Sequence, residues 1–316
     1  MRTRRLGSNG PDISVIGYGA WEIGGDAYGP NPDERELVSA IHAALDAGVN
    51  WVDTAEVYGK GNSESIVGRA LSGRPDVLVA TKVAPAPVGS GFRPEEVRRA
   101  VRGSLQRLGR DHIDLYQLHW PAGDNVCPVE ETWSTMASLV DEGLVRHVGV
   151  SNFDRELIER CLGVRHVDSL QPQLSMLHRK NEELAAWSGS RGVGVVVYGP
   201  LAYGLLTGAV GADTKFEESD WRSGKDPNHS YYKDLFAPDR LPRNLGMVDA
   251  LRPVAQRLDV SLGQLALAWV AQRPGVTSAI AGSRSRAHNQ ENAAAGDIAL
   301  GDADVAEVES ILDAVG

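Results

Sequence analysis

The stretch Leu115-Tyr116-Gln117-Leu118-His119-Trp120-Pro121 has the apolar and aromatic composition of a β-strand and stops on a histidine. Two other short runs, Asn50-Trp51-Val52-Asp53 and Leu78-Val79-Ala80-Thr81-Lys82, also stop on one ionisable residue. Ionisable side chains at the ends of separate strands meet when the strands are parallel and lie in one sheet. We therefore predict that these three strand ends contribute to one active site.

Runs of this kind recur along the chain at intervals of roughly 20 to 40 residues, with helix-like segments between them. The runs that we predict as strands are residues 15–19, 50–53, 77–82, 115–119, 147–151, 169–171, 193–198 and 278–281. Eight such units in about 300 residues are typical of a (β/α)8 barrel, in which the loops after the strands converge on one face and hold the reactive groups. The sequence therefore predicts an α/β fold of the (β/α)8, or TIM barrel, type.

The clearest helices repeat apolar residues three and four positions apart, from Leu37 to Leu45, from Val97 to Leu108 and from Trp133 to Val140. A glycine follows each of these segments within three residues and suits a helix end. Near the N-terminus, the Asn9-Gly10 pair predicts the turn of a small β-hairpin that precedes the barrel.

The second choice of fold is a doubly wound sheet, because Ile16-Gly17-Tyr18-Gly19-Ala20-Trp21-Glu22 looks like a dinucleotide-binding glycine pattern. Glu22 stands at the third glycine position, and Trp21 is too bulky for close packing between a helix and a strand. No helix is expected to begin there. The barrel is therefore preferred.

Composition limits the class of protein. With 316 residues, of which 42% are hydrophobic, the chain can bury a large core, and we treat residues 1–316 as one domain. A formal charge of −10 gives no general basic field, so neither nucleic acid nor an anionic membrane surface is expected as a partner. Only two cysteines occur, Cys127 and Cys161, and they lack metal-type spacing, so we expect neither a disulfide framework nor a metal site. A cytoplasmic location is therefore expected.

Five motifs occur together along the chain. They are Asp53-Thr54-Ala55-Glu56-Val57-Tyr58-Gly59, the strand that ends in Lys82, His119-Trp120-Pro121, Gly149-Val150-Ser151-Asn152-Phe153 and Tyr198-Gly199-Pro200-Leu201. In this order and spacing the chain resembles the aldo-keto reductase superfamily from about Leu6 to Asn292. The joint occurrence of the motifs is far more specific than any one of them.

The resemblance implies an enzyme in which NADPH gives a hydride to a carbonyl carbon while Tyr58 gives a proton to the carbonyl oxygen. A phenol titrates near 10, so it needs a neighbouring positive charge to act as an acid near neutrality. Lys82 is expected to supply that charge, and Asp53 is expected to pair with Lys82. His119 is expected to orient the carbonyl and to form an oxyanion site with the tyrosine.

The same resemblance implies contacts with the nicotinamide end of the cofactor. Ser151, Asn152 and Gln171 match side chains that hydrogen-bond the carboxamide, and Tyr198 matches the aromatic residue that stacks on the ring. Without the other motifs, Ser151 and Asn152 would be interpreted as the N-cap of a helix over residues 154–162.

Further cofactor contacts are implied for two segments. They are assigned to Gly199, Leu201, Gly204, Leu205, Thr207 and Gly208 after the seventh strand, and to Gly282, Ser283, Arg284, His288, Glu291 and Asn292 after the eighth. Backbone N–H groups at a helix start together with Ser283 and Arg284 make an anion site, which predicts NADPH over NADH. His288 departs from the family pattern, since relatives usually carry Gln or Arg at that position.

Residues 208–245 lack clear periodicity and carry several aromatic side chains. Loops of this length in compact domains are usually lids, and in the family the loop after strand 7 covers the cofactor pyrophosphate. Trp21 and Trp120 are predicted to line the substrate pocket, with Tyr28, Phe92 and Trp221 as weaker candidates and the tract from Val83 to Gly91 as one wall. Large aromatic side chains suit flat or apolar carbonyl compounds.

Two other functions stay open. One is a barrel aldolase or isomerase in which Lys82 forms a Schiff base with its substrate. The other is a regulatory subunit that keeps NADPH bound as a redox sensor with little turnover. The leading function is an NADPH-dependent carbonyl reductase, whose partner is a small-molecule carbonyl compound and which is expected to be a monomer.

Overall fold

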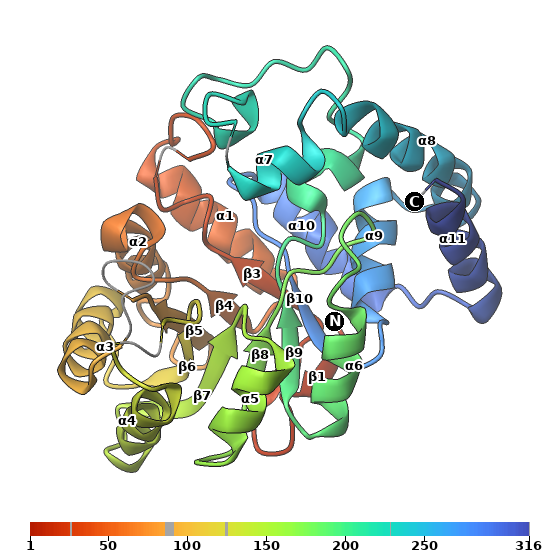
Figure 1. Cartoon of the computed structure of the whole chain (residues 1–316). Helices are drawn as coiled ribbons and strands as arrows, with labels where there is room; N and C mark the ends of the chain where they lie inside the picture. The colour runs from red at the N-terminus through yellow and green to blue at the C-terminus, as the bar shows by residue number, and fades with distance from the viewer. Residues whose placement is uncertain (26, 86–91, 124–125, 228, 316) are drawn as a thin grey trace.

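The structure, a computed structural model, describes residues 1–25, 27–85, 92–123, 126–227 and 229–315 (Figure 1). Within these residues, eight parallel strands close into a barrel in the order β10-β3-β4-β5-β6-β7-β8-β9. They are β3 (Ile16–Gly19), β4 (Trp51–Asp53), β5 (Leu78–Val83), β6 (Ile113–Leu118), β7 (Val145–Ser151), β8 (Ser169–Gln171), β9 (Gly194–Val197) and β10 (Val276–Ile280). Every run predicted as a strand is one, so the (β/α)8 prediction is confirmed.

Helices alternate with the strands and surround the barrel (Figure 1). The α-helices are α1 (Glu34–Asp46), α2 (Asn62–Ala70), α3 (Pro94–Leu108), α4 (Val129–Asp141), α5 (Arg155–Leu162), α6 (Glu182–Ser190), α7 (Ser230–Leu235), α8 (Leu241–Arg257), α9 (Leu262–Ala271), α10 (Arg286–Ala294) and α11 (Asp302–Val315). The 3-10 turns are η1 (Tyr58–Gly61), η2 (Ala202–Thr207), η3 (Trp221–Ser223) and η4 (Ala295–Asp297). Across the described residues, no helix combines the length and the apolar character needed to cross a membrane.

The glycine pattern in β3 makes room for a neighbouring side chain inside the barrel and does not belong to a doubly wound sheet. A Cβ atom on Gly17 would lie 2.2 Å from the indole of Trp51, so glycine is needed there to admit that ring into the barrel. The helix that follows β3 begins only at Glu34, which confirms that no helix starts at the glycine pattern.

The predicted N-terminal hairpin is confirmed as β1 (Thr3–Arg5) paired antiparallel with β2 (Asp12–Ser14). Its connection, residues 6–11, contains the Asn9-Gly10 pair as predicted, and the Leu6 amide donates to the Pro11 carbonyl across it. The residue with positive φ is Gly7, at 59°. A side chain at Gly7 would collide with the carbonyl of Gly192, 2.5 Å from an added Cβ, so close packing against the barrel selects this glycine.

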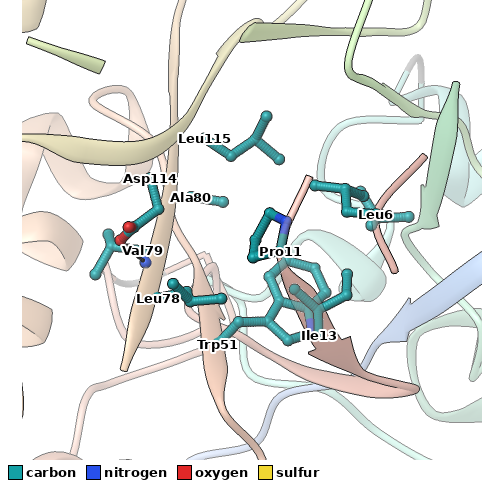
Figure 2. A pocket seen from close by; sticks show the side chains of 10 residues that line it. Leu6, Pro11, Ile13, Trp51, Leu78, Val79, Ala80, Asp114 and Leu115 are labelled. Carbon is teal, nitrogen blue, oxygen red and sulfur yellow. Dashed lines mark hydrogen bonds between the residues drawn. The ribbon is translucent and has the colours of Figure 1, made fainter. Parts of the chain in front are cut away.

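The hairpin closes the end of the barrel at which the strands begin. Leu6 and Ile13 pack there against Trp51, Leu115 and Val196 from the barrel interior. Figure 2 shows the small apolar cavity that remains between the hairpin residues and the first residues of the strands. This cavity lies at the opposite end from Asp53, the last residue of β4, and it therefore has no part in the chemistry described below.

The stretch predicted as a long loop, residues 208–245, carries more secondary structure than expected. It contains η3 and α7, and α8 begins inside it at Leu241. The short α7 lies across the end of the barrel at which the strands finish, away from the helices that ring the sheet (Figure 1). This segment was hard to recognise because α7 has only six residues, fewer than two helical turns.

Candidate active site

Asp53 and Lys82 form a buried ion pair at the mouth of the barrel. Asp53 ends β4, and Lys82 stands next to the last residue of β5. The Lys82 ammonium donates to the Asp53 carboxylate over 2.6 Å and to the Thr54 carbonyl over 2.9 Å. Lys82 is fully buried, so its charge depends on these partners and not on water.

Tyr58 reaches this pair from η1, the turn after β4. The distance between the Lys82 ammonium and the Tyr58 hydroxyl is 3.4 Å. Gly59 follows with a φ of 57°, and a Cβ atom on it would lie only 1.5 Å from the Gly24 carbonyl. Glycine is therefore required beside Tyr58 to let the turn lie against the loop after β3.

His119 completes the group that the sequence predicted. Its ring lies edge-on to the Tyr58 ring, with 5.6 Å between centroids, and stacks on Trp120 with 3.8 Å between centroids. Burial lowers the pKa of His119 well below its usual value, with the Lys82 charge as a second cause. The imidazole is therefore neutral near pH 7 and can donate one N–H to a ligand.

Burial raises the pKa of Tyr58 well above its usual value, and the Asp53 carboxylate adds to this effect. Burial also lowers the pKa of Lys82, although Asp53 opposes that change. The direction for Tyr58 is opposite to the acidification expected from a neighbouring ammonium, because burial disfavours the phenolate and the Asp53 carboxylate repels it. The phenol is thus held as a protonated donor, which a general acid must be before it reacts.

The residues predicted to hold the nicotinamide carboxamide are linked to this group. The Gln171 amide donates to the second Asp53 oxygen over 2.9 Å, and the Asn152 amide donates to the His119 carbonyl over 3.0 Å. Tyr198 donates from its hydroxyl to the Asn152 side chain over 2.8 Å. Asn152 has a positive φ of 61°, a conformation that asparagine tolerates better than most residues.

Ser151 and Asn152 do not cap a helix. The N-cap of α5 is Asp154, whose side chain accepts a hydrogen bond from the Leu157 amide over 2.9 Å. The Ser151 hydroxyl instead donates to the Gln171 carbonyl over 2.9 Å. The capping interpretation is therefore wrong, and both side chains are hydrogen-bonded to residues that follow or end neighbouring strands.

Six aromatic rings cover the site. This aromatic cover consists of Trp21, Tyr28, Tyr203, Trp221, His229 and Tyr231. Trp21 lies against Tyr58 at 6.3 Å between centroids and is stacked with Trp221 at 6.4 Å. The Tyr231 hydroxyl, on α7, donates to the Tyr198 hydroxyl over 3.3 Å.

Sequence reasoning found Trp21, Tyr28 and Trp221 of this cover but missed Tyr203, which stacks on Tyr231 at 4.7 Å. Tyr203 has a φ of 56° inside η2, and no local pattern predicts that conformation for a tyrosine. Phe92, a weaker pocket candidate, is instead part of the core, only 3% exposed, and accepts a hydrogen bond from Thr132 at its carbonyl. Of the wall proposed from Val83 to Gly91, residues 86–91 lie outside the described residues.

Arg222, in η3, links the segment after β9 to the loop after β3, a role that the sequence did not reveal. Its guanidinium pairs with Asp220 over 2.6 Å and donates to the Tyr203 carbonyl over 3.1 Å. It also lies 4.9 Å from the Tyr28 ring and 4.5 Å from the Phe216 ring. Such sandwiched guanidinium groups gain attraction from both ring faces.

The segment after β10 forms the predicted start of a helix. Ser285 caps α10 by accepting from the His288 amide, and the Ser283 hydroxyl is 3.3 Å from the His288 ring. Arg284 donates to the carbonyls of Tyr28 and Pro30, over 2.6 and 2.9 Å. Arg284 therefore ties this segment to the loop after β3, while His288 is exposed beside the N-terminal turn of α10.

Glu22 is a second unexpected group at this mouth. Burial raises its pKa to about 7, against the opposing charges of Arg222 and Arg284. Because the folded pKa exceeds the unfolded one, ionising Glu22 costs stability as the pH rises from about 4.5 through 7.

We expect Glu22→Gln to raise the free energy of unfolding by about 3 kcal/mol at pH 8 and by much less at pH 5. Urea denaturation at both pH values measures this; an equal gain at both would contradict it.

Comparisons with known proteins agree with this geometry. The model of the aldo/keto reductase family matches residues 15–313. The aldo-keto reductase YhdN of Bacillus subtilis is 36% identical over 293 residues, covering 90% of this chain and 85% of the relative. The NADH-specific methylglyoxal reductase of Escherichia coli is 32% identical, covering 100% and 99%. A probable voltage-gated potassium channel subunit beta of Oryza sativa is also 32% identical, covering 94% and 92%.

Solved structures give the same result. A glycerol dehydrogenase from Gluconobacter oxydans superposes with a TM-score of 0.83 at 33% identity, covering 99% of this chain and 95% of the other. An aldo/keto reductase from Klebsiella pneumoniae, solved in complex with NADP and acetate, superposes with a TM-score of 0.72 at 30% identity, covering 97% and 95%. The family match spans nearly the whole barrel, and the chain therefore belongs to the aldo/keto reductase family.

Proposed function

We propose that the chain is an NADP(H)-dependent oxidoreductase that reduces an aldehyde or ketone to an alcohol. The proposal rests on one observation. A continuous chain of hydrogen bonds runs from the Tyr58 hydroxyl through Lys82 and Asp53 to the Gln171 amide. It joins a protonated acid to an amide suited to a nicotinamide carboxamide. The names of the relatives, several of which are reductases or dehydrogenases, support the same reaction class.

NADPH, held at its nicotinamide end by Asn152, Gln171 and Tyr198, would supply the hydride to the carbonyl carbon when bound. Tyr58 gives its proton to the carbonyl oxygen, and the Lys82 ammonium stabilises the phenolate that develops. Neutral His119 donates an N–H to the same oxygen and fixes the direction of the carbonyl. The aromatic cover excludes water, which strengthens these interactions.

The residues present fit the cofactor at both ends. Asn152 and Gln171 offer amide groups beside the catalytic group, and Tyr198 offers a ring face next to them. At the other end, the start of α10 carries Ser283, Ser285 and His288, a donor set suited to phosphate. We propose that the segment bearing η3 and α7 covers the pyrophosphate, with Gly204 and Leu205 as backbone contacts at its base.

The test is the loss of NADPH absorbance with a panel of aldehydes, ketones and sugars, with NADH assayed in parallel. Turnover of at least one carbonyl compound is expected. Tight NADPH binding without turnover of any of them would contradict the reductase and favour a regulatory subunit, the alternative that the potassium channel relative suggests.

The preference for NADPH is expected to depend on His288. We expect His288→Ala to lower the ratio of kcat/KM for NADPH to kcat/KM for NADH about tenfold, since one hydrogen bond to a charged phosphate contributes about 1.5 kcal/mol. His288→Arg is the matched variant and should raise the ratio. Steady-state kinetics with both cofactors measure it; an equal fall in both efficiencies would show that His288 does not read the 2′-phosphate.

A further inference from the structure

Glu64 is a buried carboxylate outside the barrel, behind the strand that carries Lys82. It stands in the first turn of α2, the helix that directly follows the Tyr58 turn, and its side chain is 0% exposed. The sequence gives no sign of this, because an acidic residue in the first turn of a helix is common at the surface. A buried carboxylate requires partners, and those of Glu64 lie on two other elements.

The first partner is Thr81 on β5. The Thr81 hydroxyl donates to the Glu64 carboxylate over 2.7 Å. Neighbouring residues of a strand point to opposite faces, so Thr81 faces α2 while Lys82 faces the barrel interior. Glu64 therefore fixes the helix after Tyr58 to the outer face of the strand whose inner face presents Lys82.

The second partner is Arg107 on α3. Its guanidinium donates to the other Glu64 oxygen over 2.6 Å. The Arg107 side chain also packs on Gly61, the last residue of η1, where an added Cβ would lie 2.6 Å from it. The ion pair of Glu64 and Arg107 thus holds the Tyr58 turn from its far end.

Resting on the proposed function, we propose that Glu64 is a positioning residue that sets the distance between the Tyr58 hydroxyl and the Lys82 ammonium. That distance, 3.4 Å, is already at the long end of a hydrogen bond. A shift of α2 against β5 would break it, and a displacement of about 1 Å in an active site can cost 10²-fold in rate.

Glu64 also acts on Lys82 through charge. It is a second carboxylate that favours the ammonium form, after Asp53, and its own partner Arg107 is 31% exposed and so partly screened by water. The titratable groups on the Lys82 side of β5 are Asp53 on β4, Tyr58 on η1 and His119 after β6. Glu64 lies on the other side of the strand, where Glu56, Tyr116 and Arg107 surround it. Loss of the Glu64 charge should therefore shift the alkaline limb of the pH profile to lower pH.

Two variants separate the positioning effect of the Glu64 contacts from the effect of the Glu64 charge. Glu64→Gln keeps the length and removes the charge: kcat should fall about 30-fold and the alkaline limb of kcat should move down by about one pH unit. Glu64→Asp keeps the charge but is too short to contact both partners, so kcat should fall about tenfold with the limb unmoved. The Kd for NADPH should stay within about twofold in both, since Glu64 touches no cofactor residue.

Glu34→Gln is the matched control, because Glu34 on α1 pairs at the surface with Arg69 of α2, the helix that carries Glu64. It should leave kcat and the pH profile unchanged. If Glu64→Gln does not fold, Thr81→Val removes only the hydroxyl and should lower kcat about tenfold. Lower melting temperatures with kcat and the pH limb unchanged in the Glu64 and Thr81 variants would overturn the proposal.

The proposal and the reductase function can fail separately. If wild type binds NADPH but reduces no carbonyl compound, the reductase function fails. In that case ¹³C NMR of labelled lysine, with the Lys82 signal assigned from Lys82→Met, still reports the charge of Lys82. The Lys82 signal should titrate at lower pH in Glu64→Gln than in wild type, and an identical titration would overturn the role of Glu64.

Discussion

Replacing Tyr58 with phenylalanine is expected to abolish carbonyl reduction, with kcat lowered about 10³-fold, while NADPH still binds. The ring and its packing against Trp21 and His119 are retained, and only the hydroxyl beside Lys82 is lost. A positioned general acid contributes about 10² to 10⁴ in rate, and here the same group also closes the oxyanion site. Single-turnover kinetics with saturating NADPH, together with a measured Kd for NADPH, test the expectation.

The chain offers a matched control for this variant. Tyr203 lies in the same aromatic cover, and within the described residues its buried hydroxyl has no hydrogen-bond partner. Tyr203→Phe should leave kcat within about threefold of wild type, since no proton passes through that hydroxyl. Unchanged turnover in Tyr58→Phe would remove Tyr58 from the mechanism, whereas equal losses in both variants would point to disturbed packing of the cover.

Lys82→Met is expected to give the second large effect, on stability as well as on rate. Removing the ammonium leaves the Asp53 carboxylate buried, 3% exposed and without its ion-pair partner, which typically costs 3–5 kcal/mol. The Asp53→Asn/Lys82→Met double variant should recover most of that stability and none of the activity. Urea denaturation and NADPH turnover of the two variants measure both quantities.

The environment of Lys82 also distinguishes the reductase from the Schiff-base alternative. Lys82 has no exposed surface, and its ammonium already donates to Asp53, Thr54 and Tyr58. We therefore expect borohydride to trap no covalent adduct between the wild-type chain and a carbonyl substrate. A trapped adduct that disappears in Lys82→Met would instead show an aldolase or isomerase.

The fold was accessible from sequence because its signals are local. Short β-rich runs and apolar helical periods repeat often enough to give the barrel order, and the motif order placed Asp53, Tyr58, Lys82 and His119 together. The hairpin turn was placed correctly at Asn9-Gly10, but the need for glycine at Gly7, which meets a barrel carbonyl, was not predicted. That constraint comes from contact with Gly192, far away in the chain.

What sequence reasoning missed shares one physical cause. Tyr203, Arg222 and Glu64 owe their positions to partners from other elements: the ring of Tyr231, the carbonyl of Tyr203 and the face of β5. None of these contacts leaves a periodic pattern or a turn signal. The raised pKa of Tyr58 was likewise hidden, because it depends first on how completely the folded chain buries the phenol and then on the nearby Asp53 carboxylate.

The aromatic cover has a consequence for how the protein can be observed. Trp21 lies against Tyr58 and is stacked with Trp221, so its indole lies beside the place proposed for the reduced nicotinamide. Indole emission overlaps the absorption of that ring, and energy transfer at such short range is efficient. The aromatic cover is therefore an intrinsic fluorescent reporter. Its tryptophan emission would fall when the reduced cofactor binds and rise again once the cofactor is oxidised or released.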